Sequence, residues 1–515
     1  MSTKKQLSLW GAVAIGVGSM IGSGWLFAAY YSAKYAGPAS IFSWVIGAII
    51  ALCLAFLLAE IATLYQERGL LARLFTITHN RDCGFLVALS NWLCLVIMIP
   101  SEAVATMQYV STVAPRFTPY VFVNHNLTLL GIVIVGLLII GYGLINFWGI
   151  RSLAKINNVI TVIKILVPLL AGIAIMAASF HPHNFVDYRG TIIPYGVGTV
   201  FAAVTNSGVF YAFFGYSLIA IFAKEIKNPK KNIPLALAIS VLICLLIYLV
   251  LQFAFIGALS PSMIAKGWKH LDFNSPLVQL ALILDLNLLV IILYADSALS
   301  PSGSGIVYAG SVMRVLTGMA KDRQMPMFFD NLHPVFNISR RSMIFSLLLS
   351  FVLVFFFSNW QKIMLLVTVF QLISSVTIPL AFTKLRQIKP DEYRLFRMPF
   401  GNILSFVIYL LLTFLLTQTG TTALLMSLFL YVIFFLLYSL SYYGGKVDKL
   451  IRAFLSAWTI FTYLAFMTLY GYFQQINVLQ RPVILVSFFI VAAIFYWLIM
   501  QQKDFQTKTP KLIKA

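Results

Sequence analysis

Long apolar runs separated by short polar segments extend along the whole chain. Because a helix needs about 20 mostly apolar residues to cross a bilayer, we expect fourteen such runs to form one membrane-spanning helix each. The expected spans are 8–35, 38–66, 83–113, 127–148, 152–180, 195–223, 232–258, 283–318, 341–358, 360–384, 402–418, 421–443, 453–474 and 481–501. The pattern therefore predicts an all-α polytopic membrane protein.

The composition supports a single membrane domain. Of the 515 residues, 61% are hydrophobic and 10% are charged, whereas a soluble protein has about 45–50% apolar and about 25% charged residues. A chain this apolar cannot cover itself with a polar surface in water. The four cysteines lie inside or at the edge of apolar runs, where we expect buried side chains and not a disulfide framework.

Basic residues are concentrated on one side of the predicted membrane. The formal net charge is +21, and with the N-terminus placed inside, 28 of the 36 Lys and Arg residues fall in cytoplasmic segments and 7 in outer ones. This bias predicts two cytoplasmic termini, and the short basic loops indicate a lipid bilayer as partner and no nucleic acid. We expect a plasma membrane protein, in a bacterium the inner membrane. In the outer segment 259–282, Trp268 and Phe273 are expected to anchor at the membrane surface.

Membrane enzymes and primary pumps are disfavoured by the motifs. All six histidines fall in predicted loops, no helix carries a His-Glu-x-x-His pattern, and no phosphate-binding Gly-x-x-x-x-Gly-Lys-Ser/Thr loop occurs. The pair His181-Pro-His183 fits a solvated loop better than a metal site. We therefore expect no catalytic residue, metal or cofactor. Secondary transport and passive conduction of small molecules remain.

The first span contains a sequence that disfavours a continuous helix. Residues 16–24 read Gly-Val-Gly-Ser-Met-Ile-Gly-Ser-Gly, and each glycine costs about 1 kcal/mol relative to alanine in a helix. Unpaired backbone is not tolerated in lipid and has to line a cavity. Freed amides of the second half-helix suit a carboxylate and freed carbonyls of the first suit an ammonium. The alternative is close helix packing through small residues.

The sixth span repeats this feature. Its centre, residues 207–217, reads Ser-Gly-Val-Phe-Tyr-Ala-Phe-Phe-Gly-Tyr-Ser, with glycines among aromatic side chains that can close over a ligand. Spans 1 and 6 are then the first members of two five-helix repeats. Because five is odd, the second repeat starts on the opposite side of the membrane, and the repeats are inverted.

Five segments, in order along residues 18–401, resemble the amino acid–polyamine–organocation transporter superfamily. They are Gly18-Ser-Met-Ile-Gly-Ser-Gly24; Ala59-Glu60; Phe213-Phe-Gly-Tyr216 with the loop 224–234; Met319-Ala-Lys-Asp-Arg-Gln-Met-Pro326; and Phe396-Arg-Met-Pro-Phe-Gly401. Two positions depart from the common pattern: Arg68-Gly69-Leu70-Leu71 replaces paired glycines, and Ser217 replaces an acidic residue. The second departure disfavours a specialised acid-sensitive exchanger.

The resemblance implies a LeuT-type fold with 5+5 inverted repeats. Residues 1–401 would form the transporter core, with repeats at about 8–180 and 195–384; 402–443 would form helices 11–12, and 444–515 would form helices 13–14 and a basic tail. The substrate carboxylate would meet the amides of Ile21, Gly22, Ser23 and Gly24. Its α-amino group would meet the carbonyls of Met20, Tyr211 and Phe214, and Tyr211 and Phe213 would form an aromatic gate.

Charged residues inside the predicted membrane are functional candidates, because burying them is costly. Lys164 lies midway along span 5 and resembles a lysine that replaces sodium in proton-coupled branches; an amine in a low dielectric can lose and regain its proton near neutral pH. The charged form would bridge span 1 carbonyls to span 8. There, Asp296, Ser300 and Ser304 share one helix face. Ser300 or Ser304 would face Lys164, and Asp296 is its candidate partner. The alternative is a permanent structural cation.

A further carboxylate lies in the middle of span 3. Glu102 would border the pocket in this fold, where it could contact a cationic substrate group, carry the coupling proton, or serve as a protonated structural group. Glu60 and Glu225 are expected near the inner face, paired with loop lysines or arginines.

Together these features predict secondary active transport of amino acids by alternating access, coupled to protons as symport. An amino acid or polyamine exchanger and a non-transporting amino acid sensor remain alternatives. The substrate side chain, the proton stoichiometry and the oligomeric state do not follow from the sequence.

Overall fold

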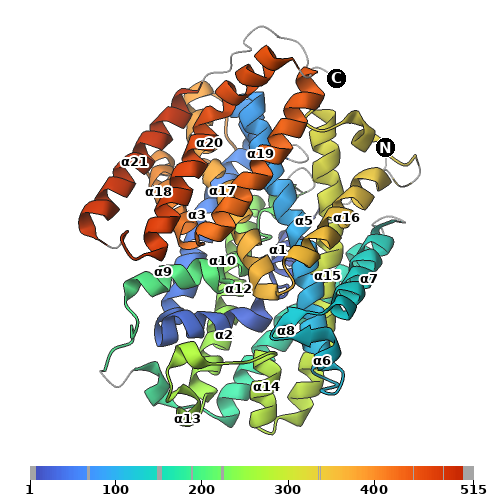
Figure 1. Cartoon of the computed structure of the whole chain (residues 1–515), viewed down its shortest axis with the longest axis vertical. Helices are drawn as coiled ribbons and strands as arrows, with labels where there is room; N and C mark the ends of the chain where they lie inside the picture. The colour runs from blue at the N-terminus through green and yellow to red at the C-terminus, as the bar shows by residue number, and fades with distance from the viewer. Residues whose placement is uncertain are drawn as a thin grey trace.

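The protein is described by a computed structural model that is almost entirely helical (Figure 1). The described residues are 7–65, 70–147, 153–186, 190–221, 226–334, 336, 338–444, 446–479 and 481–502. Arg68, Gly69, Lys224, Glu225 and the tail after residue 502 lie outside them.

The helices and strands of the first half are as follows: α1 Leu9–Met20, α2 Gly24–Ala36, α3 Ser40–Leu64, α4 Leu70–Thr78, α5 Arg81–Ser111, α6 Thr118–Val121, β1 Phe122–Val123, β2 Asn126–Leu127, α7 Leu129–Phe147, α8 Leu153–Ala178, α9 Val197–Asn206, α10 Val209–Ala212, α11 Leu218–Ile221 and α12 Pro229–Ala258. The second half contains α13 Pro261–Ile264, α14 Pro276–Ile283, α15 Asn287–Lys321, α16 Arg340–Phe356, α17 Trp360–Ile388, α18 Gly401–Gln418, α19 Thr421–Tyr443, α20 Val447–Gln475 and α21 Pro482–Gln501. Strands β1 and β2 form a small antiparallel hairpin.

Every expected span coincides with a long helix or with a broken one. Within the described residues, eleven helical segments are long and apolar enough to cross a membrane, and α1 and α9 are shorter apolar helices. The first span is divided into α1 and α2, and the sixth into α9, α10 and α11. The number of crossings and the cytoplasmic placement of both termini stay predictions.

Local sequence signals set where the helices begin and end. The side chain of Asn80 accepts a hydrogen bond from the amide of Cys83 at 2.8 Å and caps α5. Pro229, which has no N–H to lose, begins α12. Gly420, with φ of 90°, separates α18 from α19 and confirms the turn expected there.

Two helices form the centre of the molecule. Nearly all residues of α5 and α17 are buried, whereas most residues of α21 face outward. In Figure 1 helices α18 to α21 lie together at the upper left, and α13 and α14 lie at the opposite end. The half-helices α1, α2 and α10 lie between these ends, with α1 and α2 packed against α12 and α10 packed against α17.

The outer segment 259–282 packs differently from the expectation. Trp268 and Phe273 are both buried, Trp268 against Gly37 and Phe273 against the rings of Tyr30 and Phe255. The prediction that they anchor the segment in the membrane surface was therefore wrong. These aromatic side chains instead fix the segment to the outer ends of α2 and α12.

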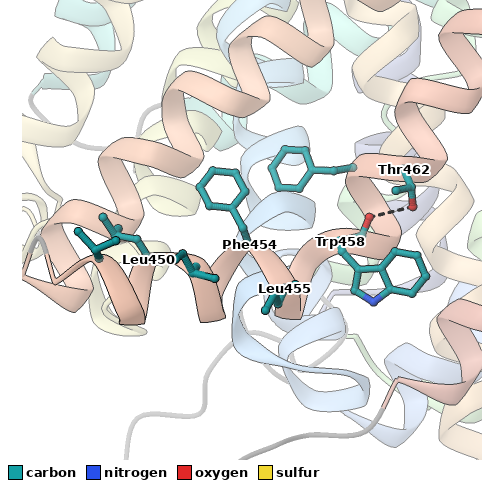
Figure 2. A pocket seen from close by; sticks show the side chains of 8 residues that line it. Leu450, Phe454, Leu455, Trp458 and Thr462 are labelled. Atoms are coloured by element: carbon teal, nitrogen blue, oxygen red, sulfur yellow. Dashed lines mark hydrogen bonds between the residues drawn. The ribbon is translucent and has the colours of Figure 1, made fainter.

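An apolar groove of about 670 Å³ runs along one face of α20 (Figure 2). It is lined by Val447, Leu450, Ile451, Phe454, Leu455, Trp458, Phe461 and Thr462. The groove belongs to the peripheral helices and is made by none of the residues at the two helix breaks.

A buried histidine between α4 and α5 predicts acid sensitivity. The ring of His79 stacks on Phe75 at 4.1 Å between ring centres, and its buried Nε2 has no hydrogen-bond partner in the described part of the chain. Burial, together with the charge of Lys384, lowers the pKa of His79 from 6.5 to about 3. Below pH 6.5 His79 binds a proton in the unfolded chain but stays neutral in the folded chain. The free energy of unfolding is therefore unaffected by His79 above pH 6.5 and decreases as the pH falls from 6.5 toward 3.

We expect the melting temperature of the His79→Gln protein to fall less between pH 6.5 and 5 than that of the wild type. At about 1.4 kcal/mol per pH unit, the wild type loses about 2 kcal/mol between pH 6.5 and 5 through this residue, and the variant does not. Melting temperatures of the purified protein from pH 7.5 to 5 test this. Parallel curves for the two proteins would contradict it.

Candidate functional site

Two interrupted helices meet in the middle of the molecule. Helix α1 ends at Met20 and α2 begins at Gly24, so residues 21–23 separate them. The second interruption separates α9 from α11 and contains Gly208 and Gly215, with φ of 90° and 112°. Both predicted breaks are therefore present.

The two breaks touch through their backbones. A Cβ on Gly215 would lie 2.8 Å from the carbonyl carbon and oxygen of Ser19, and the Ser19 hydroxyl donates to the Gly215 carbonyl at 3.1 Å. On the other side, a Cβ on Gly24 would lie 3.0 Å from Cβ of Ala212. Only glycine allows the approach at position 215, because both its φ and the facing backbone exclude a side chain.

We expect Gly215→Ala to destabilise the protein by about 1–3 kcal/mol from backbone strain alone, with a further loss from separation of the breaks. Gly318→Ala is the matched control, because a Cβ there meets nothing within 4 Å. Melting temperatures of the two purified variants provide the comparison. A Gly215→Ala protein as stable as the Gly318→Ala protein would contradict the close contact.

Glu102 reaches the first break from α5. Its Oε2 accepts a hydrogen bond from the Ser23 amide at 2.7 Å, and its Oε1 accepts one from the Tyr211 hydroxyl at 2.8 Å. The Tyr211 hydroxyl also lies 2.9 Å from Oγ of Ser23 and 2.8 Å from Oγ of Ser101. Each of the two breaks thus donates one hydrogen bond to this buried carboxylate.

The backbone groups expected to hold a substrate are partly engaged in this conformation. The amide of Ile21 donates to the Val17 carbonyl and the amide of Gly22 donates to the Met20 carbonyl, each at 3.0 Å. The Met20 carbonyl also accepts from Tyr248 at 3.2 Å.

In the second break, the Tyr211 carbonyl accepts from the Phe214 amide at 2.9 Å. Among the amides expected to bind the substrate carboxylate, the Ser23 amide donates to the carboxylate of Glu102. Substrate binding by these groups stays a prediction.

The aromatic cover over the site differs from the expected pair. Tyr211 lies at the site, but Phe213 packs on the far side of the break, 6.1 Å from Trp44 and 5.4 Å from Tyr248 between ring centres. The second ring is Trp360, at the start of α17, whose Nε1 donates to Oγ of Ser23 at 3.1 Å. The Trp360 ring also stacks on the ring of Phe27, with 4.4 Å between the ring centres. Trp360, and not Phe213, therefore lies beside Tyr211 at the break, at 5.9 Å between ring centres, and a gate role for these rings stays a prediction.

Lys164 joins the first break to α15, as expected of a charged bridge. Its Nζ donates to the Gly18 carbonyl at 2.9 Å and to Oγ of Ser304 at 2.7 Å. The Ser304 hydroxyl in turn lies 3.4 Å from the Ile21 carbonyl. The ammonium thus links the end of α1 to the residue that faces it on α15.

Asp296 does not contact Lys164 directly. Its Oδ1 accepts from Ser300 at 2.9 Å, and its buried Oδ2 has no hydrogen-bond partner among the described residues. The direct Lys164–Asp296 pair was therefore a wrong expectation, because Ser304, two turns along the same helix face, holds the lysine instead.

Sequence reasoning missed three side chains that close the site. Tyr308 donates to the Ser19 carbonyl at 2.8 Å, and Tyr248 donates to the Ala212 carbonyl at 2.9 Å. Gln371 donates to the Phe210 carbonyl at 3.0 Å. All three accepting carbonyls lie at the breaks, so the signal in the sequence was the break itself and not any motif around these residues.

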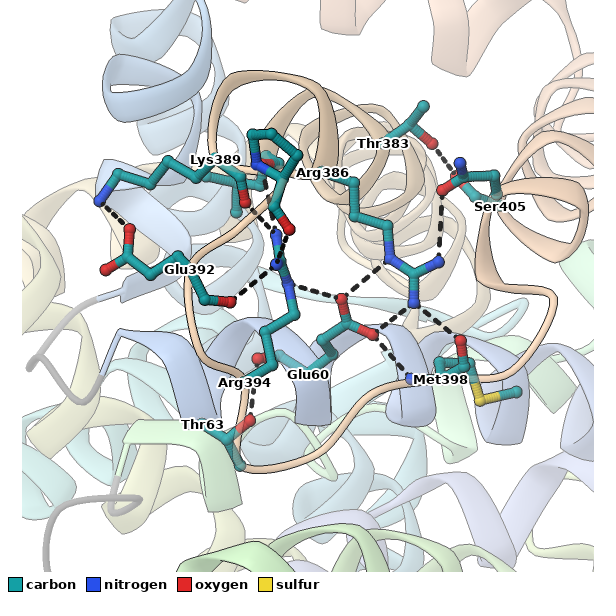
Figure 3. A network of polar contacts seen from close by, with 12 residues as sticks. Glu60, Thr63, Thr383, Arg386, Lys389, Glu392, Arg394, Met398 and Ser405 are labelled. Atoms are coloured by element: carbon teal, nitrogen blue, oxygen red, sulfur yellow. Dashed lines mark hydrogen bonds and ion pairs between the residues drawn. The ribbon is translucent and has the colours of Figure 1, made fainter.

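A second buried network lies where α3 and α17 end (Figure 3). The Glu60 carboxylate pairs with Arg386 at 2.7 Å and with Arg394 at 3.0 Å. It also accepts from the Met398 amide at 2.7 Å. Pairing of Glu60 with loop arginines was expected. The network attaches segment 396–401, one of the five segments that resemble the transporter superfamily, to the end of α3.

The described part of the chain holds no group of three or more His, Cys, Asp or Glu residues arranged for a metal ion. The hydrogen-bonding groups described at the breaks include backbone amides and carbonyls, hydroxyls, the Trp360 indole, the Gln371 amide, the Glu102 carboxylate and the Lys164 ammonium. Such a set suits a small molecule that carries both charges.

Comparison with protein families identifies residues 7–422 as matching the amino acid permease family. The glutamate/serine transporter AimA of Bacillus subtilis is 39% identical over 404 residues, which cover 78% of this chain and 75% of that protein. The aspartate-proton symporter of the same organism is 28% identical and covers 96% of both chains.

A solved structure supports the fold. The crystal structure of the Eremococcus coleocola manganese transporter matches with a TM-score of 0.56 at 13% identity, covering 89% of this chain and 99% of that one. This likeness concerns the fold alone. With the family match over most of its length, the chain belongs to the amino acid permease family of the amino acid–polyamine–organocation superfamily, and it is an integral membrane transporter, not an enzyme.

Proposed function

We propose that the protein is a proton-coupled amino acid symporter that works by alternating access. The observation that carries the proposal is the position of Lys164, whose Nζ bonds both the Gly18 carbonyl and the Ser304 hydroxyl. Loss of its proton removes a charge that these two oxygens bind, and so weakens the link between α1 and α15. Proton binding and movement of the first break are then coupled through one residue.

The architecture in this proposal consists of two inverted five-helix repeats, α1–α8 and α9–α17, within residues 1–401. Each begins with a broken helix, which supports the assignment. Helices α18 and α19, and then α20 and α21, are additions to this core. Substrate is held between the breaks, with Tyr211 and Trp360 closing the outer side and the Glu60 network closing the inner side.

The names of the relatives indicate which substrates to examine. They are a glutamate/serine transporter, an aspartate-proton symporter and the branched-chain amino acid permease BcaP of Bacillus subtilis, which is 26% identical over 87% of this chain and 95% of its own length. We propose an amino acid substrate taken up from outside together with protons, in a bacterial inner membrane.

Uptake into proteoliposomes tests the proposal. Labelled glutamate, aspartate, serine and leucine are offered with and without an inwardly directed proton gradient. Uphill accumulation of at least one amino acid only with the gradient is expected. Uptake that ignores the gradient and needs amino acid preloaded inside would show an exchanger, and binding without flux would show a sensor.

A further inference from the structure

The carboxylate of Glu102 lies where a substrate carboxylate is expected. Helix α2 is 13 residues long, and the amino end of a helix carries partial positive charge and attracts anions. At that end the Ser23 amide donates to Oε2 of Glu102 at 2.7 Å. Glu102 is 1% exposed and Ser23 is fully buried, so the helix end is bonded to a group of the protein itself.

The chain is shaped around this carboxylate. A Cβ added to Gly22 would lie 2.6 Å from Oε1 of Glu102 and 3.1 Å from its carboxyl carbon. The Tyr211 hydroxyl donates to Oε1 at 2.8 Å and holds the group from the other break. The single N–H of the Ser23 amide is thus already donated to Glu102.

Glu102 has donors but no close cation. Lys164 gives its hydrogen bonds to the Gly18 carbonyl and Ser304 and not to Glu102. Among the described residues no ion pair within 4.0 Å includes Glu102. A carboxylate in this position gains strongly from a new ammonium partner.

We propose that Glu102 is a built-in stand-in for the substrate carboxylate, and that an amino acid binds by displacing it. The substrate carboxylate takes the Ser23 amide, and Glu102 moves to the substrate ammonium. The inference rests on the proposed function, which it deepens: the site selects zwitterions, because an acid without an ammonium leaves the displaced Glu102 without a partner.

Binding of matched acids to the purified full-length protein tests this. Serine is compared with 3-hydroxypropionate, and glutamate with glutarate, since each pair differs only in the ammonium. In the wild type we expect the amino acid to bind at least about 10-fold more tightly than its partner, the effect of one charge-assisted hydrogen bond.

In Glu102→Ala the difference is expected to shrink by at least about 10-fold, and the acids without an ammonium are expected to bind more tightly than they do to the wild type. Glu102→Gln keeps the shape and an acceptor for the Ser23 amide but loses the charge. It is expected to reduce the difference as well, with little gain in affinity for those acids. Glu392→Gln, on an exposed loop, is the control and should behave as the wild type.

The results separate this inference from the proposed function. If the wild type binds and transports amino acids but the Glu102 variants keep its preference for the ammonium, displacement is wrong and the transport function stands. Weaker binding of both members of each pair, with an unchanged ratio, would likewise assign Glu102 to structure alone. A wild type that binds and transports none of glutamate, aspartate, serine and leucine would overturn both.

Discussion

Replacing Lys164 with methionine is expected to abolish uphill amino acid accumulation driven by a proton gradient. Methionine keeps most of the side-chain volume but cannot bind a proton or donate to the Gly18 carbonyl and Ser304. Hydrogen bonds to charged groups contribute about 1.5–3 kcal/mol each, so downhill uptake is expected to fall by at least about 10-fold as well. Labelled uptake in proteoliposomes, with and without the gradient, measures both effects.

Lys362→Met is the matched control, because this lysine is exposed near the start of α17. It is expected to accumulate substrate as the wild type does. A Lys164→Met protein that still concentrates substrate when the gradient is applied would show that Lys164 is a structural cation. The proton would then have to be carried elsewhere.

Removing the Glu60 carboxylate is expected to have the largest effect on stability. The side chains of Glu60 and Arg394 are 3% and 4% exposed, and Glu60→Ala leaves Arg394 and Arg386 buried without their anion. Breaking a buried ion pair by removing one partner costs about 3–5 kcal/mol. The network joins α3 to α17 and to the loop before α18. We therefore also expect the inner side of the transporter to open more readily in Glu60→Ala. Faster labelling of cysteine side chains from that side would measure this opening.

The loop supplies its own control. Glu392 pairs with Lys389 at 2.7 Å, but both side chains are more than one third exposed, and such pairs contribute at most about 1 kcal/mol. Melting temperatures of Glu60→Ala and Glu392→Ala should therefore differ clearly. Equal values would mean that the buried network adds nothing to stability beyond an exposed pair.

The helices could be predicted from the sequence because apolar length is a local property. The expected span 421–443 has the same limits as α19, and the turn after residue 418 is present. The error in segment 259–282 has a physical cause: an amphipathic aromatic segment satisfies a membrane surface and a protein groove equally well. Nothing within the segment itself shows that Trp268 packs on Gly37.

The parts of the site formed by the two helix breaks could be predicted from the sequence. The side chains that reach the breaks from distant positions could not. Glycine spacing located both breaks, and the cost of burying charge singled out Lys164 and Glu102. Trp360 contacts Ser23 across 337 positions of the chain, and no pattern near either residue encodes that contact. For the same reason a shared helix face suggested Asp296 as the partner of Lys164, although Ser304 has that place.

The central claim, coupling of amino acid entry to proton entry, is tested most directly by the internal pH of proteoliposomes. Vesicles that hold a pH-sensitive dye, with equal pH on both sides and no internal amino acid, receive the transported amino acid from outside. The account predicts that the interior becomes acidic when the amino acid is added and that it does not with the Lys164→Met protein. Amino acid entry without any change of internal pH would contradict it.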